Sequence, residues 1–444
     1  MCSRYLVIFG LACLLFAPTA CCVKKASKPL APTAFKAVDR EAHKFTMPGE
    51  FEPIESVWLA YPTYENRKGF PSTEIQAQMI QALAPHVYID LLVQDEKDQK
   101  IARKWIATLN IPNGRVRYHL IPHTDIWIRD MGPIFLYNRK GDLKIADFGF
   151  SEWSYSKPTD PTAMIDERVD RLIAHELDLP IVRANIISEG GNREFNGKGT
   201  LLVTEAVEMQ RNPGMTKQEI ERELKRVFNV SNVIWLKQGL ADDDLTYKGM
   251  LPGNVLPVMT TGGHIDEYAR FVNTNTILLA QVSEEERNSN AVDAISYQRM
   301  EENYKILKSA VDQDGKPFDI LRVPIAKSIH VTLTDQDKVY QFLQNMRYDD
   351  GTVIKKGEQI TIVIAASYLN FLVANEVVLV PKYWQEGRDE EYRKKDDAVQ
   401  KIFEHVFPNR KVVRINPENV NAGGGGIHCI SQQMPKRAKH MVDN

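Results

Sequence analysis

Short apolar runs alternate with amphipathic helical patterns from residue 45 to residue 435, and no Ser- or Gly-rich linker interrupts them. The apolar runs include 57–60, 87–93, 360–365 and 377–380, which we predict to be strands. Strands that alternate with helices indicate an α/β architecture. Because the composition marks no internal boundary, we expect one large domain over 45–435.

One helix carries a clear start signal. Thr216 and Glu219 have the spacing of a capping box, in which each residue bonds the backbone of the other. Ile220, Leu224 and Val227 follow at the spacing of a single apolar face. This pattern predicts a helix that packs against the core and has no chemical role.

The N-terminus resembles an export signal. Residues 5–17 are uncharged and follow Arg4, which is the layout of a signal peptide, here over residues 1–22. A transmembrane helix needs about 20 apolar residues, so this run is too short to span a membrane. We therefore expect an exported protein, located in the periplasm, at the cell surface or outside the cell.

Two outcomes stay open at the predicted cleavage site. Pro18, Thr19, Ala20 and Cys21 are similar to a bacterial lipobox, although leucine is usual where Pro18 stands. Lipid at Cys21 would anchor the protein to a membrane, and plain secretion is the alternative. Residues 23–44 have the composition of a linker, and residues 436–444 form a short tail.

The charge balance limits the class of ligand. The chain has 56 basic and 58 acidic residues, a formal net charge of −2. No overall basic field is present to hold a nucleic acid. A small molecule or a peptide is the expected partner, and the sequence carries no indication of oligomeric state.

Cys429 is the only cysteine beyond residue 22. One thiol cannot build a disulfide framework, and no C-x-x-C pair starts a zinc site, so we expect no metal and no cofactor. Four glycines at 423–426 remove side chains that would block approach to its sulfur. Cys429 is thus either a nucleophile or a buried spectator, and we interpret the neighbouring His428 as structural, pointing to the opposite face of a strand.

His264 follows a glycine pair in the segment TTGGHIDEYARF. A strand there would place His264 and Asp266 on one face. Imidazole titrates near neutral pH and can donate or accept a proton beside a thiol. The pattern therefore favours His264 as a general acid and base, with a lone structural histidine as the alternative.

Further carboxylates lie in two other motifs. Asp130 stands in DIWIRDMGP near Trp127, and a carboxylate with an indole can receive a planar cation. Glu189 precedes a glycine pair and Asn192 in SEGGN. Glycine pairs allow tight turns, so we expect these turns to bring Glu189, His264 and Cys429 to a common centre.

The number of carboxylates separates two enzyme classes. A cysteine peptidase pairs a thiolate with an imidazole but needs hydrogen-bond donors for an oxyanion. A substrate that stays cationic needs acceptors and negative charge instead. Guanidinium has five N–H donors and no acceptor, so two carboxylates can hold it while sulfur attacks its carbon.

Five ordered motifs resemble those of the agmatine deiminase and bacterial peptidyl-arginine deiminase family. They are WIRDMGP, SEGGN, GGHIDEYARF, SYLNFLVANEVVLVP and GGGGIHCISQQ. The resemblance implies the pentein fold, an α/β propeller of five blades with pseudo-fivefold symmetry. It also implies the following roles: Cys429 as nucleophile, His264 as general acid and base, Asp130 and Asp266 as guanidinium-binding carboxylates, Glu189 as the acid that orients His264, and Trp127 and Asn192 as further substrate-binding residues.

The implied reaction is hydrolytic deimination. Cys429 attacks the guanidinium carbon, ammonia departs, and water hydrolyses the thiouronium adduct to a ureido product. Clustered carboxylates should raise the thiol pKa in the free enzyme, and a bound guanidinium should lower it.

The substrate is less constrained than the reaction. The segment DFGFSEWSYSKPTD contains Glu152 and Trp153, and Lys157 is its only basic residue, so a cationic tail such as that of agmatine fits best. The product is then N-carbamoylputrescine, which feeds putrescine and polyamine synthesis. The alternatives are citrullination of peptide arginine and a surface lipoprotein that binds guanidines without catalysis. An extra segment at 246–261 is expected to reshape the pocket mouth.

Overall fold

The computed structural model describes residues 45–63, 72–138, 140–157 and 159–437. The predicted signal peptide, Cys21, the linker 23–44 and most of the tail 436–444 lie outside the described residues. Among the residues that are described, none of the helices is both long and apolar enough to cross a bilayer.

The described part of the chain is a mixed α/β structure with six sheets, five of which share both a pairing pattern and a strand order, in which the middle strand is followed along the chain by its parallel partner. In each of the five, a first strand runs antiparallel to a middle strand, and the middle strand runs parallel to a third. Four of these sheets use consecutive strands: β4 (Ile134–Tyr137), β5 (Leu143–Gly149) and β6 (Ile181–Ile187); β7 (Arg193–Phe195), β8 (Thr200–Thr204) and β9 (Asn232–Leu236); β11 (Ala269–Phe271), β12 (Thr276–Gln281) and β13 (Asp319–Pro324); β16 (Leu372–Val373), β17 (Val377–Pro381) and β18 (Lys411–Ile415).

The fifth sheet joins the two ends of the described chain. Its first strand is β19 (Gln432–Pro435), which pairs antiparallel with β1 (Ile54–Ala60). β1 then pairs parallel with β2 (Tyr88–Val93), and β2 with β3 (Val116–Leu120). The last strand of the described chain is therefore hydrogen-bonded to the first.

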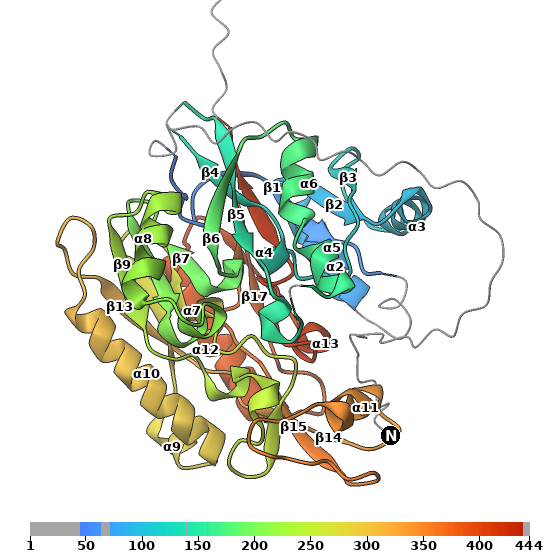
Figure 1. The fold of residues 1–444 in the computed structure, drawn as a ribbon, viewed down its shortest axis with the longest axis vertical. Coiled ribbons are helices and arrows are strands. Elements are labelled where there is room, and N and C mark those ends of the chain that lie inside the picture. The colour runs from blue at the N-terminus through green and yellow to red at the C-terminus, as the bar shows by residue number, and fades with distance from the viewer. Residues whose placement is uncertain (1–44, 64–71, 139, 158, 438–444) are drawn as a thin grey trace, which may run out of the picture.

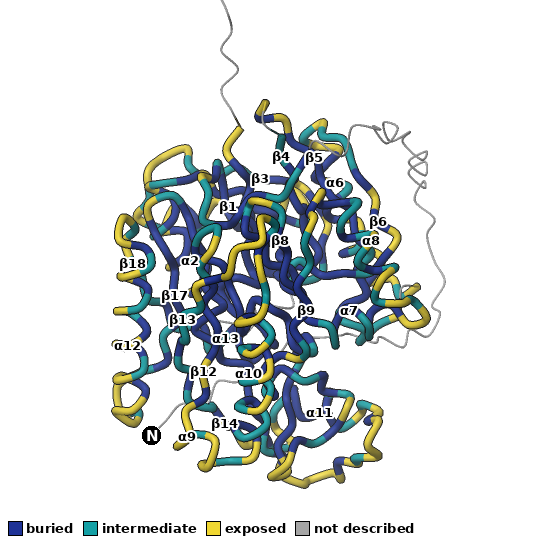
Figure 2. Tube along the Cα trace, turned by 90° about the vertical axis from the view of Figure 1, so that its left-hand side faces the viewer, coloured by how far each residue is buried: buried dark blue, intermediate teal, exposed yellow. Residues whose placement is uncertain are grey.

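Helices connect the parallel strands, as a parallel pair requires a long crossover. In the five sheets the connecting helices are α2 (Ser72–Leu83) between β1 and β2; α5 (Pro161–Asp166) and α6 (Val169–Glu176) between β5 and β6; α7 (Glu205–Arg211) and α8 (Lys217–Phe228) between β8 and β9; α9 (Glu284–Arg287) and α10 (Ala291–Ser309) between β12 and β13; and α12 (Glu390–Val406) between β17 and β18. α3 (Glu96–Ile106) links β2 to β3. The helices lie at the periphery and the buried strands inside (Figures 1 and 2).

The sixth sheet also has one antiparallel and one parallel pair, but its strands follow a different order along the chain, because the parallel partner comes first and the middle strand last. It contains β10 (Val255–Pro257), β15 (Ile360–Ile364) and β14 (Ile329–Leu333), with α11 (Lys338–Asn345) between β14 and β15. The segment 246–261, expected as an addition near the pocket, supplies β10 and a short 3-10 helix, η5 (Thr246–Lys248).

The predictions of four strands and one helix from short sequence patterns are confirmed. The four apolar runs lie in β1, β2, β15 and β17, except that Val87 precedes β2 and Ala365 follows β15. The helix predicted from the capping box is α8: the Thr216 hydroxyl accepts from the Glu219 N–H at 3.3 Å, and the Glu219 carboxylate accepts from the Thr216 N–H at 2.8 Å. Its apolar face packs into a buried cluster with Phe148 and Trp235. A cap of this kind stabilises a helix by about 1 kcal/mol.

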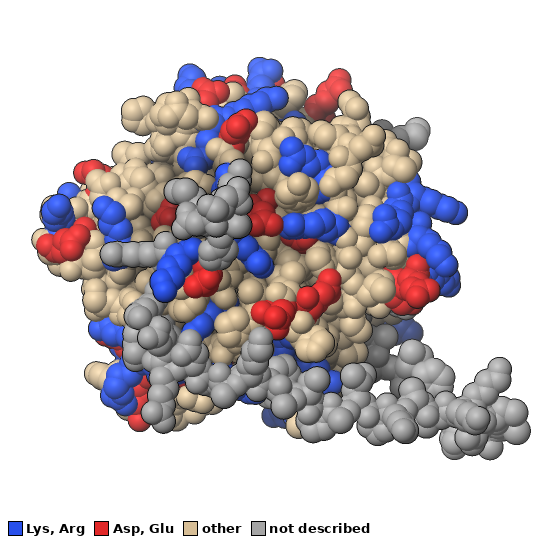
Figure 3. All heavy atoms as spheres, turned by 90° about the horizontal axis from the view of Figure 1, so that it is seen from above, with Lys and Arg blue, Asp and Glu red and all other residues tan. Residues whose placement is uncertain are grey.

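Basic and acidic side chains are interspersed over the face seen from above (Figure 3). No continuous field of one sign covers the described part of that face. This distribution agrees with the near-zero net charge of the sequence.

Candidate active site

Five segments that precede the first strands of the five similar sheets carry the five motifs. α4 (Ile128–Met131) precedes β4, η3 (Gly190–Asn192) precedes β7, and η6 (Ile265–Glu267) precedes β11. Residues 367–370 precede β16, and the turn 427–430 precedes β19. Motifs far apart in the sequence therefore occupy equivalent positions in five sheets.

The candidate residues meet around Gly191. A Cβ atom added there would lie 2.6 Å from His264 Nδ1, 3.0 Å from Asp266 Oδ2 and 3.1 Å from Asp130 Oδ1. The Gly191 N–H donates to Asp130 Oδ1 at 2.8 Å. Only glycine leaves room for these three side chains, so the glycine pair serves close approach as well as a turn.

Cys429 is buried at the same centre. Its Sγ lies 3.6 Å from Asp266 Oδ2 and 3.8 Å from Glu267 Oε1 and accepts from Asn370 Nδ2 at 3.1 Å. A Cβ atom on Gly425 would lie 2.9 Å from this sulfur, which explains the glycine run. Burial and then the carboxylates of Asp266, Glu267 and Asp130 raise the pKa of the Cys429 thiol well above its ordinary value, the direction expected from the sequence.

Glu189 contacts the imidazole of His264. His264 Nε2 lies 3.4 Å from Glu189 Oε2, and Arg211 Nε donates to Glu189 Oε1 at 2.7 Å. Burial favours the neutral acid, but Arg211 and His264 outweigh it and lower the pKa of Glu189 to about 2. Burial likewise disfavours the imidazolium, but Asp130, Glu189 and Asp266 raise the pKa of His264 to about 9. His264 therefore carries a proton at neutral pH.

Three buried polar atoms at this centre have no hydrogen-bond partner among the described residues: His264 Nδ1, Asp266 Oδ1 and Glu267 Oε2. Buried polar atoms are nearly always paired in folded proteins. Unpaired oxygens of two carboxylates beside a thiol suit a ligand that brings N–H donors.

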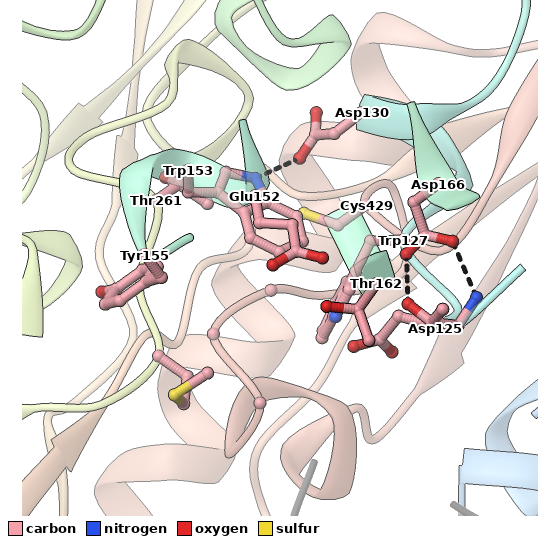
Figure 4. Close-up of a pocket in the computed structure, with 15 residues that line it drawn as sticks. Asp125, Trp127, Asp130, Glu152, Trp153, Tyr155, Thr162, Asp166, Thr261 and Cys429 are labelled. Carbon is pink, nitrogen blue, oxygen red and sulfur yellow. Dashed lines mark hydrogen bonds between the residues drawn. The ribbon is translucent and has the colours of Figure 1, made fainter. Parts of the chain in front are cut away.

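The centre opens into a pocket of about 840 Å³, a volume that includes solvent at its mouth. Cys429 and Asp130 line it together with Trp127, Trp153 and three further carboxylates. In Figure 4, Trp127, Asp125, Thr162 and Asp166 lie on one side and Trp153, Glu152 and Tyr155 on the other. None of the described residues that line this pocket is a lysine or an arginine.

The three further carboxylates form an outer acidic group, Asp125, Glu152 and Asp166. Burial is the largest cause that raises the pKa of each, and it brings Asp166 to about 7 despite two hydrogen bonds from Thr124. A carboxylate that is costly to ionise in an empty pocket is stabilised by a cation that enters it.

Two indoles frame the inner pocket. Trp127, expected beside the substrate stem, lines the pocket and meets Trp153 edge-on, with ring centroids 6.3 Å apart. Trp153 Nε1 donates to Asp130 Oδ2 at 2.8 Å (Figure 4). Glu152, Trp153 and Ser154 have φ of 47°, 54° and 69°, so three consecutive non-glycine residues adopt the left-handed conformation that places this indole.

Two local expectations are wrong. His264 and Asp266 do not share a strand: His264 precedes the 3-10 helix η6, and this turn brings both side chains to Gly191. His428 and Cys429 also lie in a turn rather than a strand. His428 is therefore not turned away from the site, because its Nδ1 lies 2.7 Å from Asp266 Oδ2.

Asn192 is not among the pocket-lining residues. Its side-chain amide donates to Glu208 Oε1 at 3.0 Å and accepts from the Thr204 N–H at 3.2 Å. Both contacts lie within its own sheet and connecting helix, so the structure does not support substrate binding by this side chain.

Sequence reasoning missed Glu267 and Asn370. Asn370 Nδ2 donates to Glu267 Oε1 at 2.9 Å as well as to the sulfur. Both residues stand inside quoted motifs, so the signal was their position in GGHIDEYARF and SYLNFLVANEVVLVP.

One group in the described part of the chain has the ligand types of a metal site. Single atoms of Asp266, Glu267 and Cys429 lie within 4.8 Å of one another. Asn370 donates N–H groups toward two of these atoms, however, and a donor aimed at the ligand atoms opposes a cation there. The arrangement fits thiol chemistry better than metal binding.

A thiol, an imidazole and paired carboxylates at the inner end of an acidic pocket define an enzyme centre for a cationic substrate. The chain belongs to the Porphyromonas-type peptidyl-arginine deiminase family, whose family model matches residues 46–435. This confirms the resemblance seen in the five motifs. The family comprises hydrolases that act on C–N bonds of guanidino groups.

Three relatives illustrate the similarity. The chain is 27% identical to the agmatine deiminase of Pseudomonas aeruginosa over 408 residues, which cover 90% of this chain and 97% of that protein. It is similar to the structure of agmatine deiminase of Enterococcus faecalis, with a TM-score of 0.70, 26% identity and coverage of 91% and 100%. The agmatine deiminase of C. jejuni shares the fold, with a TM-score of 0.61, 22% identity and coverage of 88% and 96%.

Proposed function

We propose that this protein hydrolyses agmatine to N-carbamoylputrescine and ammonia. The outer acidic group carries the proposal: Asp125, Glu152 and Asp166 line the same pocket as Cys429, and the described residues add no basic side chain to this lining. A guanidinium at the inner end and an ammonium at the outer end would match this charge distribution. The relatives named as agmatine deiminases support the same substrate.

We also propose that the five similar sheets are the blades of a five-bladed propeller. Their common pairing pattern, together with their common strand order along the chain, supports this arrangement. The position of one motif before the first strand of each sheet supports it as well. The active centre then lies where the five blades meet.

The proposed reaction starts when Asp130 and Asp266 accept the guanidinium N–H groups. The bound cation lowers the pKa of the Cys429 thiol, whose proton leaves to solvent, and the thiolate attacks the guanidinium carbon and forms a C–S bond. The C–N bond to one terminal nitrogen breaks, and that nitrogen leaves as ammonia with the proton of the His264 imidazolium. Neutral His264 then takes one proton from water, whose oxygen attacks the thiouronium carbon. The C–S bond breaks, the remaining hydroxyl proton passes to the departing Cys429 sulfur, and the ureido product and the free thiol result.

The substrate assignment has a direct test. Ammonia and ureido products are measured with agmatine, free arginine and an arginine-terminated peptide, and Cys429→Ala is the inactive control. Turnover of agmatine in preference to the other two supports the proposal. Preference for the peptide would favour the peptidyl-arginine alternative, and binding of agmatine without turnover would favour the guanidine-binding lipoprotein.

The outer acidic group is tested with Asp166→Asn. We expect KM for agmatine to rise about tenfold, the cost of one charge-assisted contact, while KM for an uncharged alkylguanidine of equal length stays the same. Asp160→Asn is the matched control, because Asp160 precedes the same helix α5 but does not line the pocket. An equal rise for both substrates would contradict recognition of the tail.

Export and lipid attachment at Cys21 are further proposals, and they are supported by the sequence of residues 1–22 alone. Cell fractionation of the wild type and of Cys21→Ala tests both. A membrane-bound wild type and a released variant support the anchor, and a wild type that stays in the cytoplasm contradicts export.

A further inference from the structure

Glu50 is a buried carboxylate behind the catalytic residues, in the turn before β1. Its oxygens contact Arg129 Nη1 at 2.7 Å, Arg270 Nη2 at 2.5 Å and Gln433 Nε2 at 3.0 Å. Both oxygens also lie 2.9 Å from His428 Nε2. These side chains occupy both oxygens of Glu50, so we treat it as a residue that acts through its neighbours rather than on a substrate.

His428 links Glu50 to the active centre. Its Nε2 faces Glu50, and its Nδ1 lies 2.7 Å from Asp266 Oδ2. The ring is fully buried, and two ionised carboxylates can only accept hydrogen bonds. A neutral imidazole has one N–H, so both contacts are hydrogen bonds only when the ring is doubly protonated and positively charged.

The contact with His428 gives the two oxygens of Asp266 different roles. Oδ2 is held by His428, whereas Oδ1 is buried without a partner among the described residues. The fixed oxygen sets the orientation of the carboxylate, and the other oxygen stays available for a guanidinium N–H. A neutral His428 would still orient Asp266 through Nδ1–H but would not supply a positive charge.

We propose that Glu50 is a positioning residue of the guanidine site, which keeps His428 doubly protonated so that His428 holds Asp266 ionised and oriented. The proposal rests on the proposed deiminase function, because it assigns a purpose to the charge on Asp266. Glu50 thereby connects the segment before β1 to a carboxylate that precedes β11.

Other charges act on the same groups. Those that face Asp266, besides His428, are Cys429, His264, Asp130, Arg270, Glu267 and Asp243. Arg129, Arg270 and His428 surround Glu50. The carboxylate of Glu194, which also contacts Arg270, repels the carboxylate of Glu50. Burial favours neutral Asp266, but the hydrogen bond and charge of His428, followed by the charges of His264 and Arg270, lower its pKa.

Glu50→Gln tests the proposal because glutamine has nearly the same shape and no charge. We expect His428 to lose its Nε2 proton, and the acid limb of the kcat/KM profile for agmatine to rise by about one pH unit, the lower end of the effect of one opposite charge. Glu194→Gln is the matched control: Glu194 is buried and bonds Arg270 Nε at 2.8 Å, but it has no contact with His428. We expect no shift of the acid limb in this control.

A second measurement needs no substrate. Nitrogen NMR of histidine-labelled protein reports how many protons each imidazole carries, and the His428 signal is assigned by its loss in His428→Gln. We expect a doubly protonated His428 in the wild type and a singly protonated ring in Glu50→Gln. This readout stays valid if agmatine is not the substrate, so the failure of the positioning role and the failure of the proposed function can be told apart.

A singly protonated His428 in the wild type at neutral pH would overturn the proposal even if no variant folds. An acid limb that does not move in Glu50→Gln, or that moves equally in Glu194→Gln, would also overturn it. Either result would mean that Glu50 stabilises the fold and does not position Asp266. A fall in the Tm of Glu50→Gln without a change in its pH profile would lead to the same conclusion.

Discussion

Replacement of Glu189 by glutamine should lower the pKa of His264 and move the basic limb of the pH profile. Glutamine keeps the shape of the side chain and an oxygen that can face His264 Nε2, which lies 3.4 Å from Glu189 Oε2 in the wild type. The change removes one of the three carboxylates that hold the pKa of His264 at about 9. The main effect is therefore electrostatic.

The magnitude follows from the distance. Two unit charges 3.4 Å apart interact by about 5 kcal/mol at an effective dielectric constant of about 20. Arg211 shares the charge of Glu189 through a contact of 2.7 Å, which reduces its effect on the imidazole. Neighbouring charges shift a pKa by about 1 to 3 units, so we expect a fall of about 2 units, from about 9 to about 7.

The direction in which kcat/KM changes with pH follows from the role of the His264 imidazolium. His264 donates its proton to the departing ammonia, so activity is lost as pH rises through its pKa. With a pKa of about 7 in Glu189→Gln, kcat/KM for agmatine should fall about tenfold at pH 8 and stay close to the wild type at pH 6.

The assay is ammonia release between pH 5 and pH 10, with Glu208→Gln as the matched control. Glu208 is a buried carboxylate near Glu189 that bonds Ser188 and Asn192 rather than His264. A basic limb that stays at its wild-type position in Glu189→Gln would refute the reasoning. A loss of activity that is equal at all pH values would also refute it and would indicate a loss of orientation alone.

Two further predictions concern the sulfur and the indole. Iodoacetamide should alkylate Cys429 slowly at neutral pH and faster as the pH rises, because burial and three carboxylates raise the thiol pKa; rapid alkylation at pH 7, followed by mass spectrometry, would contradict this. Trp153→Phe removes the N–H that donates to Asp130 Oδ2, and kcat/KM should fall about tenfold for the loss of a bond to a charged group. An unchanged Tm with this loss is the expected control result, and unchanged kcat/KM would show that the indole has no part in positioning Asp130.

Sequence reasoning succeeded where the signal is short-range. The capping box of α8 depends on residues three positions apart, and the apolar runs depend on their own composition. The motifs identified Cys429, His264, Asp130, Asp266 and Glu189, and the structure places all five side chains at one centre.

The remaining features depend on contacts between distant segments. Asn370 and Glu267 meet at the sulfur only after three sheets have packed together, and Glu50 reaches His428 from the far end of the sequence. The strand expected at His264 was wrong because the chain turns into the 3-10 helix η6 directly after His264, which places Asp266 inside the turn. The substrate-binding role expected for Asn192 stays a prediction, and its side-chain amide contacts Glu208 and Thr204.

The pairing of β19 with β1 bears on how the protein acquires activity during synthesis. A ribosome delivers β1 long before β19, so the edge of β1 stays without its partner while the segment between the two strands is made. Contacts of such long range are slow to form, and an unpaired strand edge is prone to aggregation. Cys429 lies in the turn that leads into β19. We therefore expect the pairing of β19 with β1 to place the Cys429 sulfur beside Asp266 in the same folding step. Recovery of enzymatic turnover in a refolding experiment would therefore report the final step of folding.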